Sequence, residues 1–313
     1  MRYLQLGSTG LRVSAVSLGT WAMGGDYWGP IDEQQCIDAL RAGLDHGINC
    51  IDTAPIYGHG YSETIVGRAI QGRKREDIII ATKCGVPGPN ARNTSRASIL
   101  KEIEGSLTHL GTDYIDLYQV HWPDPNTEPA ETMDTLLDLK RQGKIRFIGV
   151  SNFGIPLIEA YRALGPIDSL QPQYSLLERK IESDLLPYCH KENIGVLTYG
   201  SLGAGLLSGK YTQAPKVEEG ERRAVFYKFY QEPYFSKALE LVETLRQVAD
   251  AHDCPISQVA INWVAQQPGV TTALVGCKTP AQAIENARAG EWSLSTEELC
   301  LITEACDRIV NQL

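Results

Sequence analysis

The chain has 313 residues, 43% of them hydrophobic, with a formal net charge of −9 and a pI near 5.3. This acidic balance excludes nucleic acid as a main partner, because phosphate binding depends on Lys and Arg. The sequence has no apolar run near the ~18 residues that a membrane-spanning helix needs, and residues 1–5 lack the apolar core of a signal peptide. We therefore expect a cytoplasmic protein without a membrane partner.

Eight cysteines are spread along the chain without a CxxC pair. Several lie in apolar runs, where a free thiol packs as a small hydrophobic side chain, which favours a reducing compartment. Three residues that could be proposed as metal ligands, Asp52, His121 and His190, fit neither the HxH nor the HExxH spacing. We therefore predict no metal site.

The predicted elements begin with a short hairpin, in which residues 3–6 and 11–13 flank a turn at residues 7–10. Eight short apolar runs follow along the chain. They show little alternation of polar and apolar residues, as expected of parallel strands that are buried on both faces. These runs are residues 15–18, 48–51, 78–82, 115–120, 147–150, 169–173, 195–198 and 272–275.

Segments with helical periodicity lie between or after these runs, and some carry helix start and stop signals. One such segment has Pro129 near its first turn and Gly143 beyond its end, and another opens with Ser295 and Glu298 in capping-box spacing. The predicted helices are residues 34–45, 98–110, 129–141, 155–164, 183–191, 236–250, 256–267, 281–289 and 296–309.

Eight strand–helix units in roughly 270 residues predict an α/β fold of the (β/α)8 TIM-barrel type. An open sheet of eight parallel strands is the alternative. The barrel carries a short N-terminal β-hairpin, a long loop after strand 7 and a C-terminal helix. The loop, residues 202–234, is long enough to be functional or disordered. Since no stretch resembles a linker, we expect a single domain over residues 1–313.

Four chemically active side chains follow three consecutive predicted strands. Asp52 and Tyr57 come after one strand, Lys83 ends the next, and His121 ends the third. In a barrel the C-terminal ends of the strands form one rim, so these side chains converge there. Taken singly, each has a structural explanation as a solvated loop residue or a buried histidine. Their joint placement favours a catalytic site.

This combination of residues suits the reduction of a carbonyl group. Tyrosine is a weak acid with a reference pKa of about 10, and an adjacent ammonium lowers that pKa by stabilising the phenolate. A carboxylate keeps the lysine charged, and a histidine can orient a carbonyl oxygen. Such a site could protonate a forming alkoxide, with a nicotinamide cofactor supplying the hydride. A barrel hydrolase or lyase with the same rim residues is the alternative.

Three glycine-containing segments are candidates for phosphate binding. Residues 58–63 begin like a dinucleotide fingerprint, but Glu63 stands where the third glycine belongs, so we do not assign them to phosphate. Residues 201–210 and 276–279 follow strands 7 and 8, where barrels often bind phosphate, and each includes a lysine. Ordinary glycine-rich turns would give the same pattern.

The order of these motifs resembles the aldo-keto reductase family over essentially the whole chain. The segment Ile51–Gly58 looks like the family's second-strand signature. The resemblance is closest to the bacterial branch, which is related in layout to potassium-channel β subunits. The other segments in family order are Lys83, His121–Trp122, residues 149–153, 171–174 and 205–211, and Gly276–Lys278 with Gln282, Glu285 and Asn286.

The resemblance implies a barrel that binds NADPH/NADP+ in extended form and reduces an aldehyde or ketone. It implies Tyr57 as the general acid, Lys83 as the neighbour that lowers its pKa, Asp52 as the partner of the lysine, and His121 as the carbonyl-orienting group. The implied cofactor residues are Trp21, Asp52, Ser151, Asn152, Gln171, Tyr199, Gly200, Ser201, Leu202, Gly203, Gly205, Lys210, Arg223, Gly276, Lys278, Gln282, Glu285 and Asn286.

Within that set, Ser151, Asn152 and Gln171 are expected to hold the nicotinamide carboxamide, and Lys278 to face the 2′-phosphate. Gln282 replaces the arginine that many relatives carry there, so the preference for NADPH rests mainly on Lys278.

A small-molecule carbonyl compound is the expected partner, and both a monomer and a homo-oligomer remain open. The expected substrate-binding residues are Trp21, Tyr57, His121 and Trp122, with Tyr27 and Trp28 as further aromatic side chains on rim loops.

A second interpretation is an ancillary channel subunit that binds the cofactor with little turnover. Similar channel subunits typically carry asparagine at the histidine position. Because this chain has His121 there, an enzyme is favoured.

Overall fold

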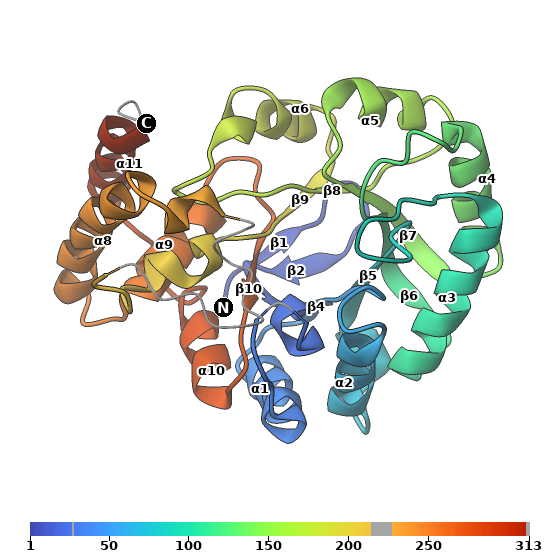
Figure 1. Cartoon of the computed structure of the whole chain (residues 1–313), viewed down its shortest axis with the longest axis horizontal. Coiled ribbons are helices and arrows are strands. Elements are labelled where there is room, and N and C mark those ends of the chain that lie inside the picture. Colours follow the sequence, from blue (N-terminus) through green and yellow to red (C-terminus); the bar gives the residue numbers. More distant parts are fainter. Residues whose placement is uncertain (27, 214–226, 311–313) are drawn as a thin grey trace.

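A computed structural model describes residues 1–26, 28–213 and 227–310 of the chain. Eight parallel strands close into a barrel, in the order β10-β3-β4-β5-β6-β7-β8-β9, with helices around it (Figure 1). The predicted TIM barrel is therefore confirmed, and the open sheet is wrong. The barrel strands are β3 (Val16–Gly19), β4 (Cys50–Asp52), β5 (Ile79–Cys84), β6 (Ile115–Val120), β7 (Ile145–Ser151), β8 (Ser169–Gln171), β9 (Gly195–Thr198) and β10 (Thr272–Gly276).

The N-terminal hairpin closes one end of the barrel. Strands β1 (Tyr3–Gln5) and β2 (Arg12–Ser14) pair antiparallel, as predicted. Leu6, which follows β1, and Val13 of β2 are completely buried and pack with interior barrel residues such as Ala81. Because these apolar side chains fill the barrel interior, functional side chains can be placed only on the loops at the C-terminal ends of the strands.

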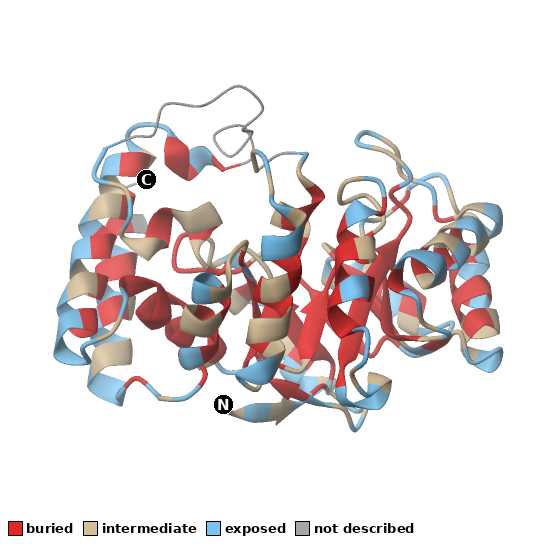
Figure 2. Cartoon of the chain, turned by 90° about the horizontal axis from the view of Figure 1, so that it is seen from below, coloured by how far each residue is buried: buried red, intermediate tan, exposed pale blue. Residues whose placement is uncertain are grey.

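The helices surround the strands, whose residues are almost all buried (Figure 2). Helices α8, α9 and α11 pack together beside the barrel. The helices are α1 (Glu33–Asp45), α2 (Tyr61–Ile70), α3 (Arg96–Leu110), α4 (Pro129–Arg141), α5 (Ile155–Arg162), α6 (Leu185–Lys191), α8 (Tyr234–Ala251), α9 (Ile256–Ala265), α10 (Pro280–Arg288) and α11 (Thr296–Val310).

Helix α2 is the element that the sequence reading missed. Gly60, with φ at 88°, precedes its first residue, so the glycines of this segment serve the entry into a helix. Glu63 lies in the first turn and is fully buried, where its carboxylate accepts a hydrogen bond of 2.7 Å from Thr82 Oγ1. The segment thus packs against strand β5.

Two local predictions concern helix and loop ends. Ser295 and Glu298 form the predicted capping box, with backbone-to-side-chain hydrogen bonds of 2.8 and 3.2 Å. The long segment after β9 contains the 3-10 helices η4 (Gly203–Ser208) and η5 (Lys228–Tyr230), whereas its residues 214–226 lie outside the described chain. Within the described ranges, the helices all fall short of the length and apolarity that crossing a bilayer demands.

Candidate active site

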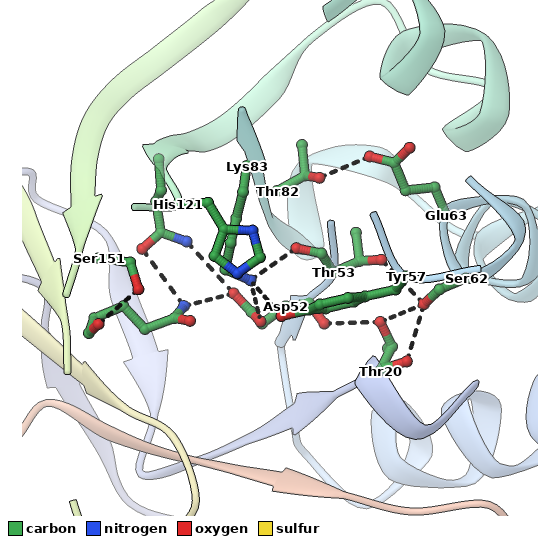
Figure 3. Close-up of polar contacts among 12 residues, drawn as sticks. Thr20, Asp52, Thr53, Tyr57, Ser62, Glu63, Thr82, Lys83, His121 and Ser151 are labelled. Atoms are coloured by element: carbon green, nitrogen blue, oxygen red, sulfur yellow. Dashed lines mark hydrogen bonds and ion pairs between the residues drawn. The ribbon is translucent and has the colours of Figure 1, made fainter. Parts of the chain in front are cut away.

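The strand register brings Asp52 and Lys83 together at the C-terminal rim. Asp52 ends β4 and is paired with Ala81 of β5, two residues before Lys83. The Lys83 ammonium is completely buried and donates hydrogen bonds to Asp52 Oδ1 at 2.7 Å and to the carbonyl of Thr53 at 2.9 Å. Its third donor points at the Tyr57 hydroxyl, 3.3 Å away (Figure 3). All three N–H donors of the Lys83 ammonium therefore have a partner, and the side chain is fixed in position.

Close backbone contact between two loops fixes Tyr57. Gly24 of η1 (Trp21–Gly24) lies so close to the following loop that a Cβ on it would meet the Gly58 nitrogen at 2.7 Å. A Cβ on Gly58, whose φ is 64°, would meet the Gly24 oxygen at 2.4 Å. The Asp26 carboxylate also accepts a hydrogen bond of 2.9 Å from the Gly58 N–H. Glycines at both positions therefore allow the loop that carries Tyr57 to lock against η1.

His121 completes the predicted cluster. It follows β6 directly, and its ring meets the Tyr57 ring edge-on with centroids 5.9 Å apart. Its backbone is held from two sides, since its N–H donates to the Cys84 carbonyl at 2.9 Å and its carbonyl accepts from Asn152 Nδ2 at 3.1 Å. The structure thus brings together all four residues that the sequence singled out.

The protonation states of this cluster follow from burial and charge. Burial and, second, the Asp52 carboxylate raise the pKa of Tyr57 well above its ordinary value. The predicted direction was the opposite, a pKa lowered by Lys83. Because Asp52 lies 2.7 Å from the ammonium, the pair carries little net charge toward the phenol, and the loss of hydration decides the shift. At neutral pH the phenol therefore keeps its proton.

The pKa values of His121 and Lys83 shift in the direction that favours the neutral forms of these two groups. Burial, followed by the positive charges of Lys83 and Arg92, lowers the pKa of His121 well below its ordinary value. Burial also lowers the pKa of Lys83, while Asp52 opposes that effect by favouring the ammonium. The imidazole is thus neutral at neutral pH and can donate one N–H to an oxygen atom.

Two glutamines hold the second oxygen of Asp52. Gln171 Nε2 donates to Asp52 Oδ2 at 2.6 Å, and Gln119 Nε2 lies 3.4 Å from the same atom. Gln171 is predicted to bind a cofactor carboxamide, and here its amide also fixes the Asp52 carboxylate. Gln119 was missed by the sequence reading. Its signal is an amide side chain in the buried strand β6, two residues before His121.

A pocket of about 630 Å³ opens over this cluster and is lined by loops from strands all around the barrel. Most of the predicted cofactor and substrate residues line it. These are Trp21, Asp52, Tyr57, His121, Trp122, Ser151, Asn152, Gln171, Tyr199, Gly200, Ser201, Leu202, Gly205, Lys210, Gly276, Lys278 and Gln282. Lining residues that the sequence reading did not select include Thr20, Arg92, Tyr227 and Cys277.

The other predicted residues lie elsewhere. Lys83 sits behind Asp52 and Tyr57, and Gly203, Glu285 and Asn286 are outside the lining. Glu285 accepts a hydrogen bond from Ser257, and Asn286 Nδ2 donates to the Gly276 carbonyl at 3.3 Å. Arg223 and Tyr27 fall outside the described residues, so their predicted roles remain predictions.

A second polar cluster lies at the C-terminal ends of β7, β8 and β9. Asn152 has a left-handed backbone, with φ at 63°, and its Nδ2 donates to Ser151 Oγ at 3.0 Å. The Tyr199 hydroxyl donates to Asn152 Oδ1 at 2.9 Å, and Ser151 Oγ donates to the Gln171 carbonyl at 2.8 Å. Linked side chains of this kind present donors and acceptors at fixed positions, which suits the recognition of an amide.

The far end of the pocket carries two lysines. A Cβ on Gly205, whose φ is 97°, would come within 3.3 Å of Lys210 Nζ, so a glycine leaves room for the ammonium over η4. Lys278 Nζ donates to the Trp28 carbonyl at 2.6 Å, and its backbone N–H donates to Gln282 Oε1 at 2.8 Å. This end combines cations, glycine turns and the start of α10, as an anion site requires.

Across the described ranges, no group of three His, Cys, Asp or Glu side chains is arranged to hold a metal ion.

The sequence model of the Aldo/keto reductase family matches residues 15–307. The chain belongs to this family. It is 43% identical to the aldo-keto reductase YhdN of Bacillus subtilis, over 95% of this chain and 91% of that protein. It is 36% identical to the NADH-specific methylglyoxal reductase of Escherichia coli, over 99% of both chains. The chain is therefore an oxidoreductase of the aldo-keto reductase type.

Solved structures of the family share the barrel. The glycerol dehydrogenase AKR11B4 from Gluconobacter oxydans aligns with a TM-score of 0.87 at 38% identity, covering 99% of this chain and 95% of that one. An aldo/keto reductase from Klebsiella pneumoniae, solved with NADP and acetate, aligns with a TM-score of 0.75 at 28% identity, covering 95% of this chain and 93% of that one.

The chain also resembles a protein of another class. It is 33% identical to a probable voltage-gated potassium channel subunit β of Arabidopsis thaliana, over 92% of this chain and 91% of that protein.

Proposed function

We propose that the chain reduces aldehydes or ketones to alcohols with NADPH, and that Tyr57 is the general acid. The observation that supports this most directly is the cluster in which Lys83 Nζ lies 2.7 Å from Asp52 Oδ1 and 3.3 Å from the Tyr57 hydroxyl. NADPH, a proton and the carbonyl compound give NADP+ and the alcohol. We take residues 1–313 as one catalytic domain that acts in the cytoplasm.

Proton transfer is the part of the reaction that the side chains perform. The raised pKa of Tyr57 keeps the phenol protonated at neutral pH, so it can donate to the oxygen of a forming alkoxide. Lys83 Nζ then stabilises the phenolate from 3.3 Å, and Asp52 keeps the ammonium in place. The neutral His121 imidazole donates a hydrogen bond to the same substrate oxygen and orients it.

The pocket residues fit a phosphate-bearing dinucleotide. When bound, NADPH supplies the hydride that reduces the carbonyl carbon. Ser151, Asn152 and Gln171 would hold the carboxamide, and Lys210 and Lys278 the phosphates. We also assign to the cofactor Trp21, Asp52, Tyr199, Gly200, Ser201, Leu202, Gly203, Gly205, Arg223, Gly276, Gln282, Glu285 and Asn286. Of these, Glu285 and Asn286 act from beside the pocket, while we assign substrate contacts to Trp21, Tyr57, His121 and Trp122.

Cofactor titration and a carbonyl screen test this proposal together. We expect NADPH fluorescence to change on binding, and the absorbance of reduced nicotinamide to fall when an aldehyde is added. In Tyr57→Phe the turnover number should fall about 10²- to 10⁴-fold, the range of a lost general acid, with little change in NADPH affinity. Wild-type turnover in this variant would remove Tyr57 from its role. A protein that binds neither NADPH nor NADH would overturn the whole assignment.

The likeness to a channel β subunit supports a second candidate, a cofactor-binding regulatory subunit with little turnover. This candidate predicts NADPH binding without reduction of any aldehyde in the screen, and co-purification with a membrane protein. His121, whose ring meets the Tyr57 ring edge-on, favours the enzyme.

A further inference from the structure

The charged side chains that line the pocket are unevenly distributed. Among the described lining residues, Arg92, Lys210 and Lys278 are cations, whereas Asp52 is acidic and is already paired with the buried Lys83. The described part of the lining is therefore positive, although the chain as a whole carries a formal charge of −9. Such a pocket concentrates anions from solution.

Arg92 stands apart from the two lysines assigned to the cofactor. It lies in the loop between β5 and α3, whereas Lys210 follows β9 and Lys278 follows β10. In the closed barrel β5 is separated from β9 by three strands in either direction, so the two loops stand on opposite sides of the rim. Arg92 is instead next to Trp122, the residue after His121, with its guanidinium 5.4 Å from the indole centroid.

The guanidinium of Arg92 keeps most of its hydrogen-bonding capacity for a ligand. Its one protein hydrogen bond in the described structure is from Nη1 to the carbonyl of Ala91, the preceding residue, at 2.9 Å. No carboxylate of the described residues forms an ion pair with it, in contrast to Arg96 four residues later, which pairs with Asp138 at 2.6 Å. Arg92 is half-buried at the pocket wall, so most of its planar set of N–H donors is left for a ligand.

We propose that Arg92 binds an oxyanion on the substrate, so that the preferred substrates are aldehydes or ketones that also carry a carboxylate or a phosphate. The proposal rests on the proposed reductase function and names its substrate class. A guanidinium matches the two oxygens of such a group with parallel hydrogen bonds, and the Trp122 face restricts its plane. The oxyanion is unchanged in the reaction, since only the carbonyl is reduced.

Paired substrates separate this proposal from the function on which it rests. The probes are 4-carboxybenzaldehyde and its neutral methyl ester, methyl 4-formylbenzoate, with D-glyceraldehyde 3-phosphate and D-glyceraldehyde as the phosphate pair. Each is assayed with saturating NADPH at low and high salt. Reduction of the neutral members tests the reductase function, and the ratio of kcat/KM between charged and neutral members tests Arg92.

In the wild type we expect kcat/KM to be at least about 10-fold higher for one or both charged members, mainly through KM, with salt narrowing the ratio. The carboxylate and phosphate arms show which oxyanion the site takes. Arg92→Met keeps an unbranched side chain next to Trp122 but removes the guanidinium, and we expect it to lower the charged-to-neutral ratio about 10- to 100-fold. Arg96→Met removes a charge outside the pocket and should leave the ratio unchanged.

Equal kcat/KM for charged and neutral members in the wild type would overturn the proposal, whether or not the variant folds. So would equal losses for both members in Arg92→Met, because these indicate a packing role. If the wild type reduces neither member of either pair but binds NADPH, the proposed reductase function fails and the substrate class falls with it.

Discussion

The two ends of the pocket are built differently. At the catalytic end, the ammonium of Lys83 is completely buried and is fixed by a carboxylate, a carbonyl and a phenol. At the opposite end, Lys210 is exposed, and Lys278 is half-buried and reaches backbone carbonyls of a neighbouring loop. The contacts of Lys83 therefore stabilise the fold as well as the proposed catalytic cluster, whereas we propose that a bound cofactor replaces the contacts of Lys210 and Lys278.

The largest expected effect tests the catalytic end. Lys83→Met leaves Asp52 buried without its cation, and we expect the free energy of unfolding to fall by about 3–5 kcal/mol. Denaturant unfolding measures this loss. Lys144→Met, which removes the partner of the exposed Glu104, is the matched control and should cost at most about 1 kcal/mol. Similar losses in the two variants would show that the buried pair does not stabilise the fold.

The second effect concerns the opposite end. Lys278→Met should weaken NADPH binding about 10- to 100-fold and NADH binding much less, because only NADPH carries the 2′-phosphate. Unfolding should change little, in contrast to Lys83→Met. Lys228→Met, in which the lost ammonium lies 4.8 Å from the Tyr234 ring and outside the pocket lining, is the control. An equal loss of affinity for NADPH and for NADH would contradict the role of Lys278. It would agree with a preference for NADH, the cofactor that the name of the Escherichia coli relative specifies.

The sequence predicted the barrel, and the meeting of the four rim residues, for a physical reason. Strands buried on both faces read as continuous apolar runs, and the chemistry of a barrel lies where such runs end. Asp52, Lys83 and His121 each mark one of those ends. Helix α2 was missed because residues 58–63 were compared only with a dinucleotide fingerprint, although Gly60 with φ at 88° opens a helix.

What the sequence could not provide was the balance of interactions around each group. The spacing put an ammonium beside Tyr57, but the pKa direction depends on Asp52 lying 2.7 Å from that ammonium and on loss of water. Gln119 and Gln171 meet at Asp52 only through the curvature of the barrel, since they come from β6 and β8. Contacts of this kind depend on closure of the sheet and leave no local sequence pattern.

A pH series sharpens the comparison at the catalytic end. The folded-state pKa of His121 is lowered, so the unfolded chain binds a proton more readily than the folded one between the ordinary value of about 6.5 and the lower folded value. His121 therefore contributes stability that is present above pH ~6.5 and is lost as the pH falls through that window. In His121→Asn we expect the free energy of unfolding to decrease less steeply than in the wild type as the pH falls below ~6.5. Parallel pH profiles for the two proteins would contradict the lowered pKa.

The smallest expected effect concerns the contribution of Gln119 to the orientation of the Asp52 carboxylate. Gln119 Nε2 lies 3.4 Å from Asp52 Oδ2, a weak contact beside the 2.6 Å hydrogen bond from Gln171. Gln119→Met should therefore lower kcat only about 2- to 5-fold, a fraction of what a full hydrogen bond contributes, and leave NADPH affinity unchanged. Gln171→Met removes the shorter bond and a proposed cofactor contact, so it should lower both quantities more. If Gln119→Met proved the more damaging of the two, the carboxylate would depend on β6 rather than on β8 for its orientation, and Gln119 would be its main positioning residue.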